Sequence, residues 1–436
     1  MTRGTDMEKK LDWNLLLSRK RPGRGAGTEG ATGESPLVRN EFGQDYSRVV
    51  FSPPFRRLSK KTQVHPFSSI DFIHNRLTHS AEVASLGQTF GLSLARFLRE
   101  AGDFPEGFAD IDFVNIVSAA GLAHDIGNPP FGHAGEDAIR AWAQSADWDG
   151  LGCDAGDWLE YDGNAQAFRM ASNPAPRENA YFKLTYATCG TLVKYPWVIG
   201  TGTKRGKAGC FRQEADLFAG IMGELGLRKG GGFVRHPLSY LMEAADDICY
   251  RVMDIEDAVT MHILSEAKMK KVLAEVAGEG TECSIQHLRG NAMHKLCESA
   301  FEAFKANYGP IMSGEFKGAL VECRAFTLKD GLEKLGQEYN LIFSERGKVA
   351  TEVACYAIMD KLFSRYAKFA RNLSAAKSIE ALHSADRKLL EFTWGREYAE
   401  AEIAPHAGDP AWWLHAVTDH VVGMTDDYAR STAALF

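Results

Sequence analysis

Apolar residues recur at helical spacing over most of this chain, and this pattern limits the fold more than any other feature of the sequence. Spacings of three and four residues mark one face of a helix, and segment 78–99 has them at Val83, Leu86, Phe90, Leu94 and Phe97. The same periodicity recurs in further segments: 110–124, 133–146, 239–259 and much of 260–436, for example 352–370. In 110–124 the predicted inner face consists of Ile111, Val114, Val117 and Leu122. The sequence therefore predicts an all-α protein.

Two regions interrupt the helical pattern. Residues 1–45 are polar and rich in glycine, as in RKRPGRGAGTEGATGESP, and predict a flexible N-terminal arm with a short helix at 11–17. Residues 147–235 have many glycines and broken periodicity, which indicates loops, short helices and a hairpin. We expect a core over 46–262 that includes this insertion, and a C-terminal helical region over 263–436 that packs on the core.

The charge of the chain is modest and unevenly distributed. The 57 acidic and 50 basic residues give a net charge of −7, which argues against a surface that binds nucleic acid throughout. Segments 46–70 and 194–212 nevertheless contain five Lys or Arg residues each and no acidic residue. Each segment is either a solvated basic face or a surface that binds an anion.

The cysteines and the apolar stretches indicate a compartment. The eight cysteines include no CxxC pair, which excludes zinc-ribbon and thioredoxin-type sites. The stretch MTRGTDMEKKLDW lacks the apolar core of a secretory signal, and 113–123 is too short to span a bilayer. We therefore expect a reduced, soluble, cytoplasmic protein without a membrane partner.

Two histidines and two carboxylates on three predicted helices form a candidate metal site. His124 and Asp125 end one helix, where adjacent side chains can converge on one ion, and His79 lies near the start of another. Asp246 interrupts an apolar helix, and a buried carboxylate needs a partner, which is a metal, a salt bridge or a helix cap. Such a mixed donor set accepts Mg²⁺ or Mn²⁺, and also Fe, Co or Zn.

Only one of two adjacent carboxylates can take the metal position on the third helix. Asp246, Tyr250 and Asp254 follow one another at four-residue intervals and so share one helix face. Asp247 points elsewhere on the same helix. The spacing favours Asp246 over Asp247 as the ligand.

The sequence around these residues resembles a known family. The words FRRLSKKTQV (55–64), NRLTHSAEV (75–83), AHDIGNPPFGHAGEDAI (123–139), GNAQAFR (163–169), LMEAADDICYRVMDIEDA (241–258) and HVVGMTDDYA (420–429) are similar to those of deoxyguanosinetriphosphate triphosphohydrolases (dGTPases) of the HD-domain superfamily. The motif AHDIGNPPFGHAGEDAI is far more selective for this family than a lone His-Asp pair. The resemblance implies that 46–262 is an HD-type helical catalytic core.

The resemblance also implies an activity and a set of site residues. The activity is metal-dependent hydrolysis of dGTP, and of other dNTPs, to deoxynucleoside and inorganic triphosphate, which would control dNTP pools. The implied metal ligands are His79, His124, Asp125 and Asp246, and the implied catalytic residues are His133 and Glu136. The implied substrate contacts are Gln63, Arg76, Asn164, Lys194, Tyr195, Tyr250 and Asp254.

The resemblance assigns roles to some of these residues. His133 and Glu136 lie three residues apart at the start of a predicted helix, so they can form a hydrogen-bonded pair. His133 is expected to protonate the leaving 5′ oxygen with Glu136 as its orienter, or to activate water instead. Tyr250 is expected beneath the deoxyribose, and Asp254 at the 3′-hydroxyl.

Two alternative functions are weighed against this one. Other HD hydrolases, such as 5′-nucleotidases, guanosine tetraphosphate hydrolases and cyclic-nucleotide phosphodiesterases, should lack the NPPFGHxGE and KTQV words that are present here. A regulator that only binds a nucleotide or single-stranded DNA should have lost a metal ligand or the His-Glu pair. The resemblance further implies a homo-oligomer, expected to be a hexamer, and a nucleotide or single-stranded DNA effector. It leaves open the base selectivity and the role of loop 200–232.

Overall fold

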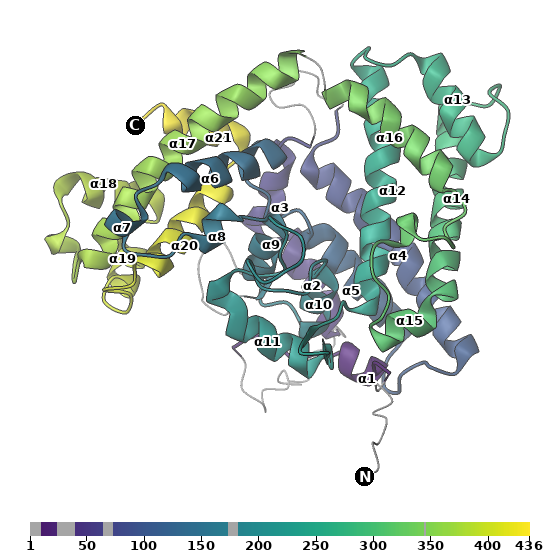
Figure 1. The fold of residues 1–436 in the computed structure, drawn as a ribbon, viewed down its shortest axis with the longest axis horizontal. Helices are drawn as coiled ribbons and strands as arrows, with labels where there is room; N and C mark the ends of the chain where they lie inside the picture. The colour runs from purple at the N-terminus through teal and green to yellow at the C-terminus, as the bar shows by residue number, and fades with distance from the viewer. Residues whose placement is uncertain (1–9, 24–39, 64–72, 173–181, 344–345) are drawn as a thin grey trace, which may run out of the picture.

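A computed structural model gives the placement of residues 10–23, 40–63, 73–172, 182–343 and 346–436, which form a helical body (Figure 1). Its helices are α1 (Trp13–Leu16), α2 (Glu41–Val50), α3 (Pro53–Arg57), α4 (Arg76–Ala101), α5 (Asp110–Ala123), α6 (His133–Ser145), α7 (Trp148–Leu151), α8 (Gly156–Leu159), α9 (Gly163–Ser172), α10 (Tyr186–Leu192), α11 (Ala215–Glu224), α12 (Pro237–Thr260), α13 (Glu266–Ala277), α14 (Ile285–Ala306), α15 (Tyr308–Ser313), α16 (Lys329–Phe343), α17 (Arg346–Ala375), α18 (Ser384–Thr393), α19 (Arg396–Glu402), α20 (Pro410–Val422) and α21 (Asp426–Ala433).

The few remaining elements are short. Turns of 3₁₀ helix lie at Leu58–Lys60, Arg212–Glu214, Leu320–Glu322 and Ile379–Ala381. A two-stranded antiparallel hairpin joins β1 (Arg228–Lys229) to β2 (Gly232–Phe233). The predicted all-α class is therefore confirmed. Segment 147–235 contains the short helices and the hairpin that were predicted there.

The backbones of helices α4 and α5 pack closely against each other. A Cβ atom added at Gly91 on α4 would lie 2.8 Å from the backbone nitrogen of Val114 on α5. A Cβ added at Gly121 on α5 would lie 3.1 Å from the α4 backbone. The approach places His79, in the first turn of α4, beside His124, which follows the last residue of α5.

Replacing Gly91 by alanine is expected to lower the free energy of unfolding by about 1–3 kcal/mol, because the new methyl group overlaps the backbone of α5. The matched control is Gly220→Ala on α11, where an added Cβ would meet no atom within 4 Å. That control should be neutral or slightly stabilising, because alanine favours a helix over glycine. Urea unfolding followed by circular dichroism compares the two variants, and equal stabilities would contradict the close approach.

The inner face of α5 differs from the prediction. Ile111 is 52% exposed and Val114 is partly exposed, whereas Val117 and Leu122 are buried as predicted. Phe113, which the predicted inner face did not include, is fully buried. The reason is that α5 packs against α2, α4, α10 and α12, so it is buried on several sides and its apolar spacing does not identify one face.

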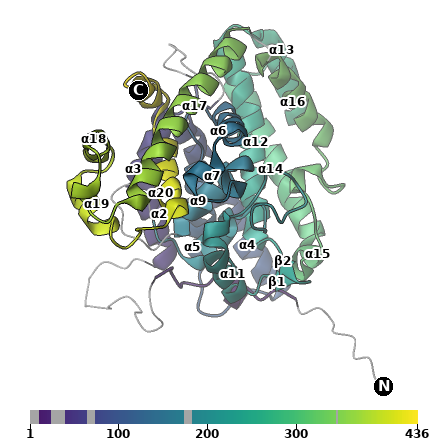
Figure 2. The ribbon, with the colours of Figure 1, turned by 60° about the vertical axis from the view of Figure 1, so that its left-hand side comes forward.

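Buried apolar residues form two clusters, and the chain passes from one to the other within 126–131. The first cluster includes residues of α1–α5 and α9–α16, and Ile126 is its last member before this passage. The second cluster includes Phe131 and residues of α6, α8, α17, α18, α20 and α21, together with Ala165 of α9, so α9 contributes to both clusters. In both ribbon views α18 and α19 lie on one side of the molecule and α14 and α16 on the other (Figures 1 and 2). The predicted C-terminal region, 263–436, is thus divided between the two clusters.

Part of the predicted flexible arm belongs to the folded body. Leu11, Trp13, Leu16 and Leu17 are buried, and the Leu11 N–H donates to the carbonyl of Met312 at 2.7 Å. The helix predicted at 11–17 corresponds to α1. The difference arises because a few apolar side chains are enough to attach a polar segment to a core. Residues 1–9 and 24–39 of the predicted arm lie outside the described residues.

His74, just before α4, links α4 to α12 through two carboxylates. Its Nδ1 lies 2.7 Å from Asp257 Oδ1, and its Nε2 lies 3.2 Å from Glu82 Oε1. Hydrogen bonds to Asp257 and Glu82 raise the pKa of His74 to about 10, although burial opposes the shift. The imidazolium form is therefore favoured in the folded protein.

The stabilisation from His74 is expected to depend on pH. Because its pKa is raised on folding, the contribution is complete below about pH 6.5, the ordinary histidine value, and is lost as the pH rises toward about 10. Urea unfolding of the wild type and of His74→Gln from pH 6 to pH 10 measures this. The difference should be about 2 kcal/mol at pH 6 and should shrink as the pH rises. A difference that grows with pH would contradict the ion pairs.

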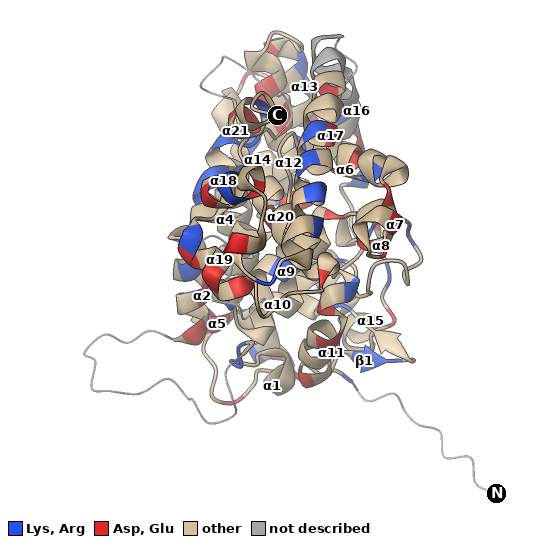
Figure 3. Cartoon of the chain, turned by 90° about the vertical axis from the view of Figure 1, so that its left-hand side faces the viewer, with Lys and Arg blue, Asp and Glu red and all other residues tan. Residues whose placement is uncertain are grey.

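The surface carries both signs of charge. Figure 3 shows acidic and basic residues interspersed along α18, α19 and the neighbouring helices of that face. Among the described residues, none of the helices combines the length and the apolar character needed to cross a membrane.

Candidate active site

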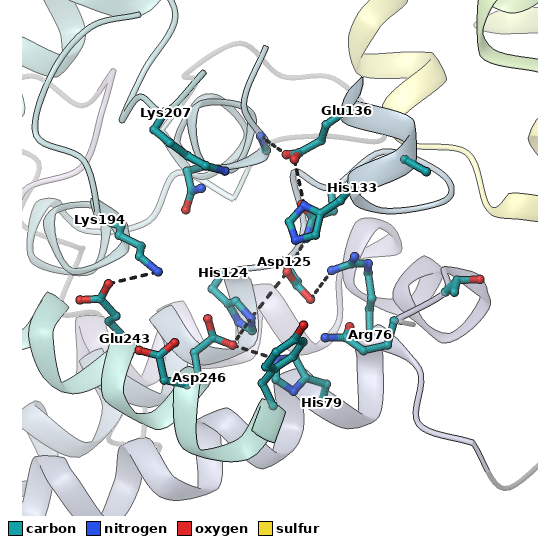
Figure 4. Close-up of a pocket in the computed structure, with 18 of the residues that line it drawn as sticks. Arg76, His79, His124, Asp125, His133, Glu136, Lys194, Lys207, Glu243 and Asp246 are labelled. Carbon is teal, nitrogen blue, oxygen red and sulfur yellow. Dashed lines mark hydrogen bonds and ion pairs between the residues drawn. The ribbon is translucent and has the colours of Figure 1, made fainter. Parts of the chain in front are cut away.

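A cavity of about 370 Å³ is lined by residues from both apolar clusters (Figure 4). Its volume suits a small-molecule ligand. Twelve of the thirteen predicted site residues line it: Gln63, Arg76, His79, His124, Asp125, His133, Glu136, Asn164, Lys194, Tyr195, Asp246 and Tyr250. The exception is Asp254, which is 2% exposed and lies one turn beyond Tyr250 on α12 without lining the cavity. A four-residue interval puts two residues on one helix face but does not bring both to the same opening.

Four of these side chains converge at the inner end of the cavity. Ligand atoms of His79, His124 and Asp125 lie within 4.8 Å of one another. Oδ1 of Asp246 lies 2.9 Å from His79 Nε2 and 3.5 Å from His124 Nε2. The structure therefore brings together the four residues that were predicted as metal ligands.

The orientation of His124 suits a metal ligand. Its Nδ1 lies 2.7 Å from the carbonyl oxygen of Gly121, which can only accept, so Nδ1 carries the proton and Nε2 faces the carboxylates. Burial alone would lower the pKa of His124, but the charges of Asp125 and Asp246 raise it to about 9. His124 and His79, against the opposing effect of burial, hold the pKa of Asp246 well below its usual range. Imidazole nitrogen beside carboxylate oxygen is a donor set that fits a divalent cation.

The charge of the lining also fits a cation. Among the described residues, six carboxylates line the cavity, whereas three side chains there are Lys or Arg. An anionic ligand would be repelled by such a lining. A divalent cation held among the carboxylates would offset part of this negative charge.

Asp246 and Asp247 face different partners. Asp246 contacts His79 and His124, as described above. Burial raises the pKa of Asp247 to about 7, with Lys194 opposing the shift and Glu243 and Asp246 adding to it. The geometry therefore favours Asp246 at the metal position, in agreement with the spacing in the sequence.

Asp125 is oriented by two hydrogen bonds. The guanidinium of Arg76 donates to Asp125 Oδ2 at 2.7 Å, and the side-chain amide of Asn128 donates to Oδ1. Burial would raise the pKa of Asp125, but Arg76 and the two histidines keep it lowered. The carboxylate is thus ionised and fixed in direction.

His133 and Glu136 form the hydrogen-bonded pair that the sequence predicted. His133 Nδ1 lies 3.0 Å from Glu136 Oε2, and the side chain of His133 is 79% exposed whereas that of Glu136 is 3% exposed. The other carboxylate oxygen, Oε1, accepts from the Gly163 N–H at 2.7 Å. Burial would raise the pKa of Glu136, but the hydrogen bond and charge of His133 lower it. An ionised carboxylate therefore holds the imidazole with Nε2 available to a ligand.

The backbone before α6 places this pair. Pro129 and Pro130 end the helical path after Asp125, and Phe131 and Gly132 then take positive φ angles of 67° and 60°. At Gly135 a Cβ atom would lie 2.0 Å from the carbonyl oxygen of Pro130, so only glycine allows the turn to fold back on α6. The word NPPFGHAGE thus encodes a compact turn that directs His133 toward the metal cluster.

The remaining predicted contacts lie around the cavity. Lys194 Nζ is 3.1 Å from Glu243 Oε1; against burial, the neighbouring carboxylates of Glu243 and Asp247 raise the pKa of Lys194. Gln63 presents an Oε1 atom that is buried and has no hydrogen-bond partner among the described residues. Such an acceptor is suited to a ligand hydroxyl or amide.

Two further residues that line the cavity, Lys207 and Glu352, belong to none of the sequence motifs. Lys207 extends into the cavity from the loop after Lys194 (Figure 4). It belongs to the acid-free basic segment 194–212, which was the available signal. Glu352 lines the cavity from α17, far along the chain, and no motif marks it.

Comparison with known proteins adds independent information. The family model described as HD domain matches residues 76–150. A deoxyguanosinetriphosphate triphosphohydrolase-like protein of Pseudomonas aeruginosa (strain LESB58) is 35% identical over 458 residues, covering 97% of this chain and 98% of the relative. A protein of the same name from Synechocystis is 33% identical over 446 residues, covering 95% and 97%. A deoxyguanosinetriphosphate triphosphohydrolase of Klebsiella pneumoniae (strain 342) is 33% identical over 307 residues, covering 61% and 58%.

Proposed function

The chain belongs to the deoxyguanosinetriphosphate triphosphohydrolase family of HD-domain proteins, and on that premise we propose that it hydrolyses dGTP to deoxyguanosine and inorganic triphosphate. The observation that carries the proposal is one cavity in which His133 and Glu136 lie beside the His79–His124–Asp125–Asp246 cluster. Cleavage of a phosphate ester with a poor leaving group requires a proton donor close to a cation site.

The cation site and the basic side chains have separate roles in this proposal. A divalent cation, proposed to be Mg²⁺ or Mn²⁺, held by His79, His124, Asp125 and Asp246 would act as a Lewis acid on a phosphoryl oxygen. Arg76, Lys194 and Lys207 line the same cavity and would bind the outer phosphate oxygens. Arg76 also keeps Asp125 ionised, so substrate binding and the metal site share one guanidinium.

The His133–Glu136 pair accounts for departure of the nucleoside. Water attacks the α-phosphorus, the bond to the 5′ oxygen breaks, and the leaving alkoxide needs a proton. The exposed Nε2 of His133 supplies it, while Glu136 fixes the ring through Nδ1 and stabilises the charged imidazolium. A positioned acid of this kind contributes about 10²–10⁴-fold in rate.

Selectivity for the deoxyribose is proposed to come from Tyr250, with Gln63 and Asn164 as further contacts. All three line the cavity. The aromatic ring of Tyr250 provides a flat, bulky surface for the sugar, and the buried acceptor of Gln63 has room for a ligand donor. The 3′-hydroxyl contact expected of Asp254 stays a prediction, since this carboxylate does not line the cavity.

The deciding experiment identifies the products. The full chain is incubated with dGTP, GTP and the other dNTPs, with Mn²⁺ or Mg²⁺, in water enriched in ¹⁸O. Chromatography with mass spectrometry should find deoxyguanosine and triphosphate, with the label in the triphosphate, and dGTP should be the best substrate. Release of pyrophosphate or phosphate would contradict the proposal in favour of another HD hydrolase. Binding of dGTP without turnover would favour a regulator.

Three further properties follow from the proposal. Turnover of dGTP in the cytoplasm would lower the dNTP pools. A homo-oligomer, predicted to be a hexamer, is checked by light scattering of the purified protein. The nucleotide or single-stranded DNA effector is checked by adding each to the triphosphate assay.

A further inference from the structure

Asp426, the first residue of α21, joins three segments that are far apart in the sequence. Its Oδ1 accepts from the Phe131 N–H at 2.9 Å. Its Oδ2 accepts from the Thr62 N–H at 3.0 Å and from the Thr62 hydroxyl. Asp426 is only 5% exposed, so one buried carboxylate binds both the turn before α6 and the segment before Gln63.

The contact with Phe131 supports the turn that directs the proton donor. Phe131 has a φ of 67°, which is unfavourable for a residue with a side chain, and it lies two residues before His133. A strained conformation persists only where its surroundings hold it. The Asp426 carboxylate supports this conformation by accepting a hydrogen bond from the Phe131 N–H.

The contact with Thr62 acts on a second segment that lines the same cavity. Thr62 and Gln63 both line it. Lys61 makes a second set of hydrogen bonds between these segments. Its buried Nζ donates to the carbonyls of Asn128 and Val422, each at 2.7 Å. The hydrogen bonds of Asp426 and those of Lys61 therefore connect the same three regions. These are the segment before Gln63, the turn after Asp125 and the end of the chain near α21.

We infer that Asp426 is a positioning residue for the reaction. It holds Phe131 and Thr62 in one hydrogen-bonded arrangement, so that His133 and Gln63 line the cavity from fixed places. This inference rests on the proposed function, because it states how the chain's last helix sets the geometry of that reaction. Asp426 does not line the cavity, and it acts through the residues that do.

The test uses Asp426→Asn in the full chain with Asp427→Ala as the matched control. Asparagine keeps the size of the side chain but presents an amide N–H to donors, so it cannot accept from both Phe131 and Thr62. Asp427 is the next residue in the same helical turn, but its side chain is 69% exposed and pairs with Arg430. The control therefore removes a helix-starting acid without touching the cavity.

Two measurements separate positioning from general stability. The kcat for triphosphate release should fall about 10–100-fold in Asp426→Asn, since a small misplacement of a reacting group costs about that much. Mn²⁺ affinity should stay within about threefold, because the proposed metal ligands are unchanged. KM should change by a smaller factor than kcat, because Gln63 is the only proposed substrate contact that lies next to a lost hydrogen bond. Hydrogen exchange in peptides covering 126–136 should become faster in Asp426→Asn and not in Asp427→Ala.

The outcomes distinguish this inference from the proposed function. A wild-type protein that releases no triphosphate would overturn the proposed function. Hydrogen exchange in peptides covering 126–136 would still show whether Asp426 holds the turn at Phe131. Equal kcat in Asp426→Asn and Asp427→Ala, in an active wild type, would overturn the positioning role alone. Should Asp426→Asn fail to fold, Thr62→Val removes only the hydroxyl bond and should give a smaller fall in kcat. An unchanged kcat in a folded Thr62→Val would also count against the role.

Discussion

Replacing Asp125 by alanine is expected to abolish triphosphate release and to weaken Mn²⁺ binding severely, while the helical fold persists. Asp125 lies within the His79–His124 cluster, and its two oxygens are directed by Arg76 and Asn128. A Lewis acid contributes several kcal/mol to transition-state stabilisation, so the loss in kcat should be about 10³-fold or more. Calorimetry or electron paramagnetic resonance with Mn²⁺ measures binding, and the triphosphate assay measures turnover.

The controls address the charge that this change leaves behind. Without Asp125 the buried Arg76 loses its partner, which by itself lowers stability. Asp125→Asn keeps an oxygen for Arg76, and His124→Ala removes a different ligand, so both should show the same loss of metal without the same strain. Asp110→Ala, at an exposed carboxylate paired with Arg99, should behave as the wild type. Wild-type turnover in Asp125→Ala or His124→Ala would show that the metal-site assignment is wrong.

Replacing His133 by alanine is expected to lower kcat by about 10²–10⁴-fold while metal and substrate still bind. Its removal takes a hydrogen-bond partner from the buried Glu136 carboxylate, so the free energy of unfolding should fall by about 1–3 kcal/mol. None of the proposed metal ligands or phosphate contacts is changed. KM and Mn²⁺ affinity should therefore match the wild type. The measurement is steady-state release of triphosphate, with binding determined separately.

Variants of the neighbouring acids identify the role of His133 more closely. Glu136→Gln should also lower kcat, and by less, because the ring keeps a hydrogen-bond partner but loses the negative charge that stabilises the imidazolium. Asp137→Ala is the matched control, since Asp137 is exposed on the same helix and pairs with Arg140. A His133→Ala variant with wild-type kcat would remove His133 from the mechanism.

The sequence was most informative where one word contains both a turn and its chemical groups. NPPFGHAGE specifies a sharp reversal followed by a helix start, so the His133–Glu136 contact could be predicted from spacing. The convergence of His79, His124 and Asp246 could be proposed because each lies at a helix end or on a helix face with a known direction.

Other features depend on contacts that no local pattern encodes. The inner face of α5 was predicted incorrectly at Ile111, because a helix buried on several sides has no single apolar face. Glu352 reaches the cavity only through the way α17 packs against α6. Periodicity reports that a residue is buried, but it does not report which element buries it. The division into two apolar clusters was invisible for the same reason.

The passage of the chain between two apolar clusters makes catalysis a property of their docking. His79, His124 and Asp246 lie on or beside helices of the first cluster, whereas His133 and Glu136 lie in the first turn of α6, which packs in the second. Packed interiors resist deformation and transmit displacement as units. In the proposed reaction, the distance between the proton donor and the cation site therefore depends on how the two clusters pack against each other. Substitutions in the core of α17 or α20, far from the cavity, are then expected to change kcat as well as stability.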